Sequence, residues 1–193
     1  MNATMLRSTA LQAARLMLVA LLLFADARAQ SSVAAEAGVV ESRIKAAFIC
    51  KFGNYVEWPR DGVRHDGPFV IGVVADDPVV GELVQAARGH TVNGRPIIVR
   101  KLVRGDPVDG LDIVFVGHSG SAWLAETLAA AHGQPILTIT ESGNAADAGS
   151  IVNFVVVDDK VRFDIALEPA EHSNLKISGR LLAVARKVTG RPS

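Results

Sequence analysis

The stretch FVIGVVADDPVVGELVQAARG, residues 69–89, contains the two signals that decide the fold. Its first part, residues 69–76, is an almost continuous apolar run, which is typical of a strand covered on both faces. The second part, residues 77–89, predicts a helix with Asp77 as its N-cap and Pro78 at its first position. A buried strand followed at once by a helix indicates an α/β fold with a mostly parallel sheet.

The same alternation continues along the chain. An Asn93-Gly94 pair predicts a tight turn before a strand, and Asp158-Asp159-Lys160 predicts the turn of an antiparallel hairpin. Strands are expected at 96–102, 111–117, 135–142, 150–157 and 161–167, and a helix at 119–133. We therefore expect a single-domain layered α/β fold, with a mostly parallel central sheet, helices on both faces, and a C-terminal β-hairpin plus helix.

A helix is expected near each end of the folded chain. Near the N-terminus, KAAFICKFGNYVEWP, residues 45–59, predicts a helix that ends before Pro59. Near the C-terminus, residues 168–188 predict mostly one helix. Helical spacing predicts one buried stripe on each helix. On the first helix the stripe consists of Val40, Ile44, Ala47, Phe48, Lys51 and Tyr55, and Phe52 and Val56 widen it. On the second helix it consists of Leu175, Ser178, Leu181, Leu182 and Ala185.

The first residues have the pattern of a Sec signal peptide. Arg7 and Arg15 precede an apolar run at 16–24, and Ala27-Arg28-Ala29 follows it. A membrane anchor is the alternative, but the run is shorter than the ~20 residues that span a bilayer. We expect an exported, periplasmic protein with a signal peptide at 1–29, a disordered lead-in at 30–38 and one domain at 39–190.

The charge of the exported chain limits its possible partners, and its single cysteine limits its possible disulfides. Three of the 20 basic and one of the 20 acidic residues precede the cleavage site, so the exported chain has a net charge of −2 and no basic run. This composition gives no electrostatic basis for binding nucleic acid. Cys50 is the single cysteine, so no disulfide forms within the chain. We expect a buried thiol, with a reactive or intermolecular thiol as the alternative.

One motif suggests catalysis. GHSGS, residues 117–121, lies between an expected strand and helix, and Asp164 and His172 follow in the order of a hydrolase triad. However, Ser121 stands where the second glycine of a nucleophile elbow belongs. The alternative is a strand-to-helix loop in which Ser119 or Ser121 caps the helix.

Other chemistry has weaker signals. The five histidines show no metal-ligand spacing, no glycine-rich nucleotide motif occurs, and the Asp-Asp pairs suit caps and turns. We therefore expect no metal, no cofactor and no catalytic residue. The histidines are His65, His90, His118, His132 and His172.

Two segments resemble the YfiR family of exported proteins. The first segment, IKAAFICKFGNYVEWP at residues 44–59, is similar to the family's opening motif K-A-x-F-x-x-x-F-x-x-Y-x-x-W-P. The second segment, residues 135–185, is similar to the family's closing half. That half begins with a strand of the pattern vLtvse, continues to a hairpin that ends in rFeIn, and finishes with the pattern a…s.Lkis..LL.lA. Between them, IGVVADD and TVNGRPIIVRKL also fit. The resemblance covers nearly the whole exported chain.

The resemblance implies a binding protein and not an enzyme. The best-understood members of that family are periplasmic homodimers that repress an inner-membrane diguanylate cyclase of the YfiN type through its periplasmic domain, and many members have no identified cyclase partner. Repression lowers cyclic di-GMP and biofilm formation, and an outer-membrane lipoprotein can sequester the repressor. Two departures concern Cys50, which cannot form the cysteine pairs of some members, and Ala166, where the family often has asparagine.

Two sets of residues are candidates for partner binding. The terminal segment mixes charges with apolar anchors, as an interface does, although a capped helix on the sheet would look the same. The first helix carries aromatic residues that suit either a core or an interface. The candidates are Phe163, Asp164, Ile165, Leu167, Glu168, Glu171, Leu175, Lys176 and Arg180 in the terminal segment, and Phe48, Phe52, Tyr55 and Trp58 in the first helix.

Three functions remain open from the sequence. The first is a non-catalytic periplasmic regulator that represses a diguanylate cyclase. The second is a small-molecule binding module that serves a sensor kinase or a transporter. The third is a serine hydrolase that uses Ser119.

Overall fold

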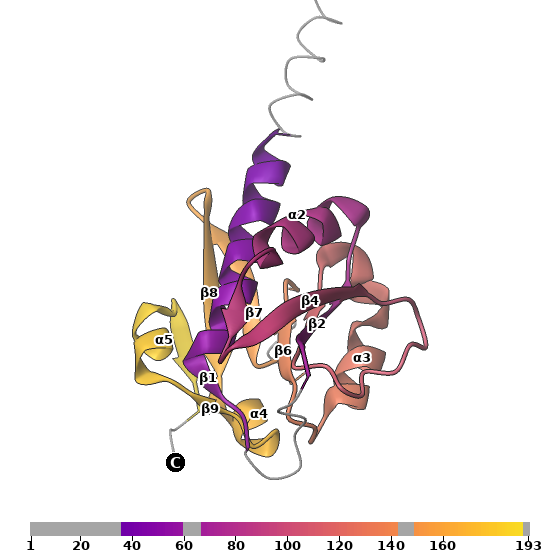
Figure 1. The fold of residues 1–193 in the computed structure, drawn as a ribbon. Helices are drawn as coiled ribbons and strands as arrows, with labels where there is room; N and C mark the ends of the chain where they lie inside the picture. Colours follow the sequence, from indigo (N-terminus) through magenta and orange to yellow (C-terminus); the bar gives the residue numbers. More distant parts are fainter. Residues whose placement is uncertain (1–35, 60–66, 143–148, 191–193) are drawn as a thin grey trace, which may run out of the picture. The chain divides into compact units, whose positions relative to one another are not determined.

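The computed structural model describes residues 36–59, 67–142 and 149–190. Eight strands form one sheet in the order β10-β8-β7-β6-β5-β2-β4-β3 (Figure 1). Neighbouring strands are parallel except in the hairpins β7-β8 and β3-β4, so the expected mostly parallel sheet is confirmed. The strands are β2 (Phe69–Val74), β3 (Thr91–Val92), β4 (Arg95–Lys101), β5 (Ile113–Val116), β6 (Leu137–Thr140), β7 (Val152–Val157), β8 (Lys160–Ala166) and β10 (Lys187–Thr189).

Two apolar clusters cover the two faces of this sheet. Phe69, Ile71 and Val73 of β2 belong to one cluster, together with apolar side chains of the first helix and of α2 (Asp77–Ala87). Val74 belongs to the other, together with residues of α3 (Leu124–Ala131). The alternation along β2 confirms a strand covered on both faces, with helices on each side.

Two tight turns set the hairpin registers. Asn93 and Gly94 have φ angles of 50° and 81°, and Asp158 and Asp159 have φ angles of 49° and 55°. Both pairs connect antiparallel strands as two-residue turns. Left-handed φ at both central residues is the requirement of a type I′ turn, which asparagine, aspartate and glycine meet most readily. Both predicted turns are confirmed.

A buried ion pair joins the beginnings of three strands. Arg95 of β4 donates from Nη1 and Nη2 to the two carboxylate oxygens of Asp112, at 2.8 and 2.9 Å. Asp112 Oδ2 also accepts from the backbone N–H of Val70, at 2.7 Å. The guanidinium further donates to the carbonyls of Gly67 and Pro68. This clamp therefore fastens β2, β4 and the residue before β5 through charge-assisted hydrogen bonds.

The predicted stripe of the first helix is right at Phe48, Phe52 and Val56 and wrong at its other positions. The described helix covers residues 36–52, and so includes positions 36–38 of the expected lead-in. Its core-facing residues are Ala46, Ile49, Cys50 and Phe52, with Val56 just beyond the helix. Five members of the predicted stripe are exposed: Val40, Ile44, Ala47, Lys51 and Tyr55. Of the predicted set, Phe48 and Phe52 pack on the strand aromatics Phe154 and Phe163.

Cys50 lies on the buried side, as expected. Its exposed fraction is 6 %, and burial raises the pKa of its thiol from the ordinary 9.0 to about 11. A thiol that is protonated and covered reacts poorly with oxidants and electrophiles.

Raising the pH should weaken the fold partly through Cys50. Above about pH 9 the unfolded chain loses the thiol proton while the folded chain keeps it, so this contribution is present below pH 9 and is lost as the pH approaches 11. Urea unfolding of wild type and Cys50→Ala between about pH 8 and 10.5 measures it. The wild type should lose stability more steeply; parallel curves would contradict a buried neutral thiol.

The predicted C-terminal helix is also wrong. The segment forms α4 (Leu167–His172), β9 (Lys176–Ile177), α5 (Gly179–Val184) and then β10. Asn174 has a left-handed φ of 54° and ends α4. Ser178 then caps α5, because its hydroxyl accepts the N–H of Leu181 at 3.3 Å. Both short strands pair with distant parts of the chain, which local helix propensity cannot anticipate.

The N-caps predicted for the helices at 77–89 and 119–133 are also wrong. Asp76, and not Asp77, occupies the N-cap position of α2, and it makes no side-chain cap bond. The expected helix at 119–133 begins as a 3₁₀ helix, η2 (His118–Trp123), whose cap position is Gly117. Neither Ser119 nor Ser121 therefore acts as the expected cap.

Candidate partner-binding surface

The structure brings together the two segments that carry the candidate partner residues. β1 (Val56–Glu57), which follows the first helix, pairs antiparallel with β9 in a separate two-stranded sheet. Glu57 lies opposite Lys176, and the N–H of Ser178 donates to the carbonyl of Tyr55 at 2.9 Å. Figure 1 shows β1 beside β9, close to α4 and α5.

The terminal candidates divide into core and surface residues. The apolar members Phe163, Ile165, Leu167 and Leu175 are 1–6 % exposed and belong to the core. Asp164 is half-buried, and its carboxylate accepts a hydrogen bond of 2.8 Å from Nε of Arg186. The exposed members are Glu168, Glu171, Lys176 and Arg180.

The first-helix aromatics divide in the same way. Phe52 is 1 % exposed, and its ring centroid lies 5.9 Å from that of Phe154 and 5.0 Å from that of Phe163. Phe48 is half-buried and packs on the same two strand rings. These contacts place both phenylalanines in the core between helix and sheet.

Tyr55 and Trp58 lie nearer the surface. Tyr55 is 39 % exposed. Trp58 is half-buried, with its ring edge-on to Phe69 at 5.4 Å. We use "β1–β9 surface" for the exposed residues on and beside this small sheet: Tyr55, Glu57, Glu168, Glu171, Lys176 and Arg180. An aromatic side chain among mixed charges is a suitable composition for a protein interface.

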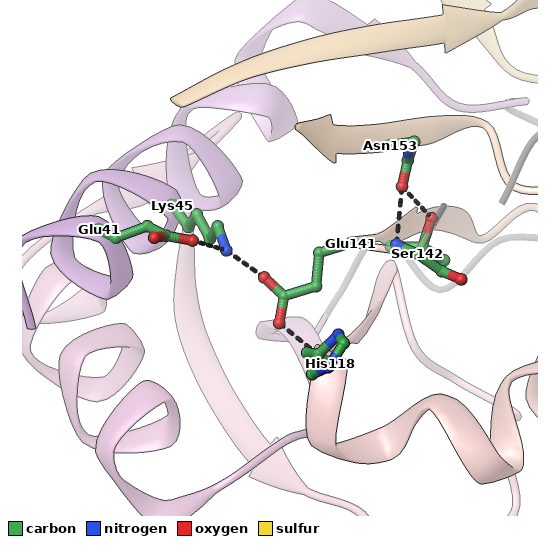
Figure 2. A network of polar contacts seen from close by, with 7 residues as sticks. Glu41, Lys45, His118, Glu141, Ser142 and Asn153 are labelled. Carbon is green, nitrogen blue, oxygen red and sulfur yellow. Dashed lines mark hydrogen bonds and ion pairs between the residues drawn. The ribbon is translucent and has the colours of Figure 1, made fainter. Parts of the chain in front are cut away.

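A polar network joins the two motif segments at the carboxyl ends of the strands (Figure 2). Lys45, the first residue of the opening motif, forms ion pairs with Glu41 and with Glu141, which directly follows β6. The other carboxylate oxygen of Glu141 accepts the backbone N–H of His118. The side chains of Lys45 and Glu141 are 10 and 12 % exposed, so the network fastens the first helix to the sheet.

Two opposing effects act on the Lys45 ammonium. Burial lowers the pKa of Lys45, but the hydrogen bonds and charges of Glu141 and Glu41 outweigh burial and raise it above 10.5. Lys45 is therefore a cation at any physiological pH. Its contribution to stability is lost only in strongly alkaline solution, as the pH rises through the raised pKa.

The structure does not assemble the possible hydrolase triad. Ser119 lines a cavity of about 310 Å³ at the carboxyl ends of β2 and β4, and the described residues around it include no histidine. His172 ends α4, which follows β8 at the opposite edge of the sheet. Asp164 is engaged by Arg186. The three groups cannot act on one substrate in this arrangement.

Packing accounts for the glycines of GHSGS. A Cβ at Gly120 would lie 2.6 Å from the carbonyl oxygen of Val74, and a Cβ at Gly117 would lie 2.9 Å from the Cβ of Ala75. Close approach of the 3₁₀ turn to the end of β2 thus requires both glycines.

Ser119→Ala should leave the protein unchanged. Its stability should stay within about 0.5 kcal/mol of wild type, because Ser119 is exposed and caps no helix. Gly120→Ala, the matched variant in the same turn, should lose about 1–3 kcal/mol through overpacking. Thermal unfolding compares them. Labelling of Ser119 by a fluorophosphonate would overturn the structural interpretation.

Two histidines that are far apart in the sequence are neighbours in the structure. The rings of His132, after α3, and His172, at the end of α4, have centroids 6.0 Å apart. They line a cavity of about 650 Å³. No local spacing could reveal this pair, because the sheet topology alone brings the ends of the two helices together.

Comparison with known proteins places the chain in a family. The family model described as YfiR/HmsC-like matches residues 42–186, within the domain expected at 39–190. No curated protein matches the chain. Within the described ranges, no helix combines the length and the apolar character needed to cross a membrane. With a match over most of its length, the chain belongs to the YfiR/HmsC-like family, a family of periplasmic regulatory domains.

Proposed function

We propose that this protein is a periplasmic, non-catalytic regulator that binds the periplasmic domain of an inner-membrane diguanylate cyclase and represses it. Repression would lower cyclic di-GMP and with it biofilm formation. Membership of the YfiR/HmsC-like family is the observation that carries the proposal. A homodimer is the expected active form, and an outer-membrane lipoprotein is a possible second partner.

We assign partner binding to the β1–β9 surface. It is supported by the exposure of Tyr55, Lys176 and Arg180 and by the pairing that holds their strands together. The buried candidates Phe163, Ile165, Leu167 and Leu175 would act indirectly, as the core under this surface. An exposed aromatic side chain with charges of both signs around it can provide an apolar centre and a polar rim.

Charge reversal on this surface should abolish binding without unfolding the protein. The variant Lys176→Glu/Arg180→Glu changes two exposed side chains, and the effect of each such change on stability usually stays within about 0.5 kcal/mol. We expect a normal melting temperature and loss of co-purification with a cyclase encoded beside the gene. Arg88→Glu is the matched control. Arg88 is exposed and directly follows α2. This helix packs on β4, which lies near the opposite end of the sheet from β8 and β10. Undiminished binding by the double variant would reject this surface.

A small-molecule binding module for a sensor kinase or transporter is the second candidate function. The cavity of about 650 Å³ beside α3 and α4 supports it, because this volume is in the range of ordinary ligand sites. Capture of a sensor kinase or a transporter in place of a cyclase, in the same co-purification, would favour this alternative.

A further inference from the structure

His132 and His172 form a pair that lines a groove beside α3 and α4. Their ring centroids are 6.0 Å apart with the ring planes at 48°. Both residues are exposed, and both line the cavity of about 650 Å³ that α3 and α4 border. The two rings come from separate elements, so a ligand shared between them would connect α3 to α4.

The surroundings of this pair favour a cation. His132 directly follows the C-terminus of α3, and His172 is the last residue of α4. Helix C-termini carry partial negative charge. Glu168, one turn before His172, lines the same groove, and none of the described lining residues is lysine or arginine. A positive ion entering the groove therefore meets negative partial charges and one carboxylate.

The separation of the rings suits a shared metal ion. An imidazole nitrogen lies about 2.0–2.1 Å from bound Zn²⁺, so two imidazoles on one tetrahedral ion have ring centres about 5 Å apart. The observed 6.0 Å is about 1 Å longer, and both side chains are exposed, so a small side-chain rotation brings the rings to this distance. Imidazole is a preferred ligand of zinc, copper and nickel and a poor one for magnesium or calcium.

We propose that His132 and His172 together bind one divalent transition-metal ion, such as Zn²⁺, in this groove. No group of three or more histidine, cysteine, aspartate or glutamate residues with metal-binding geometry occurs in the described part of the chain. The remaining coordination positions are therefore open to water or to a group that enters the groove. Glu168 is shared between the groove and the β1–β9 surface, whereas neither histidine belongs to that surface, so the zinc measurements do not require the proposed cyclase partner.

Zinc titration of the exported chain tests this site. Calorimetry near pH 7.5 should show one Zn²⁺ per chain. His132→Ala and His172→Ala should each weaken binding about tenfold or more. His90→Ala and His118→Ala are matched controls, since both residues are exposed and neither lines the groove; their affinity should equal that of wild type.

A second readout identifies the ligands directly. With Cu²⁺ as the probe, electron paramagnetic resonance should show two imidazole nitrogens in wild type and one in either groove variant. Absence of saturable Zn²⁺ binding by wild type would overturn the proposal. Zinc affinity that is unchanged in both groove variants, or lowered equally in the controls, would also overturn it.

Discussion

Replacing Asp112 with alanine is expected to destabilise the protein by about 3 kcal/mol. The carboxylate is 6 % exposed and pairs in bidentate fashion with Arg95. Its removal leaves a largely buried guanidinium without an anion and deprives the backbone N–H of Val70 of its acceptor. The beginnings of β2, β4 and β5 would lose their common fastening. Urea unfolding measures the loss as a shift of the midpoint.

The exposed pair Arg104–Glu126 provides the matched control. Its side chains are 68 and 53 % exposed, so Glu126→Ala should cost about 0.5 kcal/mol or less. The double variant Arg95→Met/Asp112→Leu should be more stable than Asp112→Ala, because it removes both charges and leaves no buried ion unpaired. Equal midpoints for Asp112→Ala and Glu126→Ala would refute the clamp.

Phe52→Ala should have an effect of similar size. Phe52, the last residue of the first helix, is 1 % exposed, and its ring stacks on that of Phe154 and meets that of Phe163 edge-on. Loss of a buried phenylalanine costs about 3–5 kcal/mol, since a cavity remains where the ring was. Thermal or urea unfolding measures it.

Tyr55→Ala is the comparison that separates core from surface. Tyr55 lies beyond the helix, where its side chain is exposed and its carbonyl accepts the N–H of Ser178; removal of its ring should cost less than about 1 kcal/mol while weakening partner binding. The interpretation fails if Tyr55→Ala unfolds the protein as Phe52→Ala does, or if Phe52→Ala leaves stability unchanged.

Elements with strong local signals were predictable from the sequence. The run at 69–76 was predicted as a strand because both of its faces are apolar, and β2 is covered on both sides. Asn93-Gly94 and Asp158-Asp159 gave the hairpin turns because few residues adopt left-handed φ. These signals arise from local backbone preferences and local hydrophobicity, so they do not depend on contacts with distant parts of the chain.

Features that depend on distant contacts were not predictable. Lys45 lies on the buried side of its helix, where Glu141, far along the chain, pairs with it together with Glu41. The short strands β9 and β10 exist because β1 and β8 offer them backbone partners. The same limit applies to the candidate sites, since the pairing of Tyr55 with Ser178 and the approach of His132 to His172 are products of topology.

The central claim is that this protein represses a diguanylate cyclase through the β1–β9 surface. Cyclic di-GMP measured in the native host tests it most directly, in the gene deletion and in strains complemented with wild type or with Lys176→Glu/Arg180→Glu. Deletion should raise cyclic di-GMP, wild type should lower it again, and the double variant should fail to do so. Unchanged cyclic di-GMP in the deletion strain, with a co-encoded cyclase expressed, would contradict the claim and favour the small-molecule binding module.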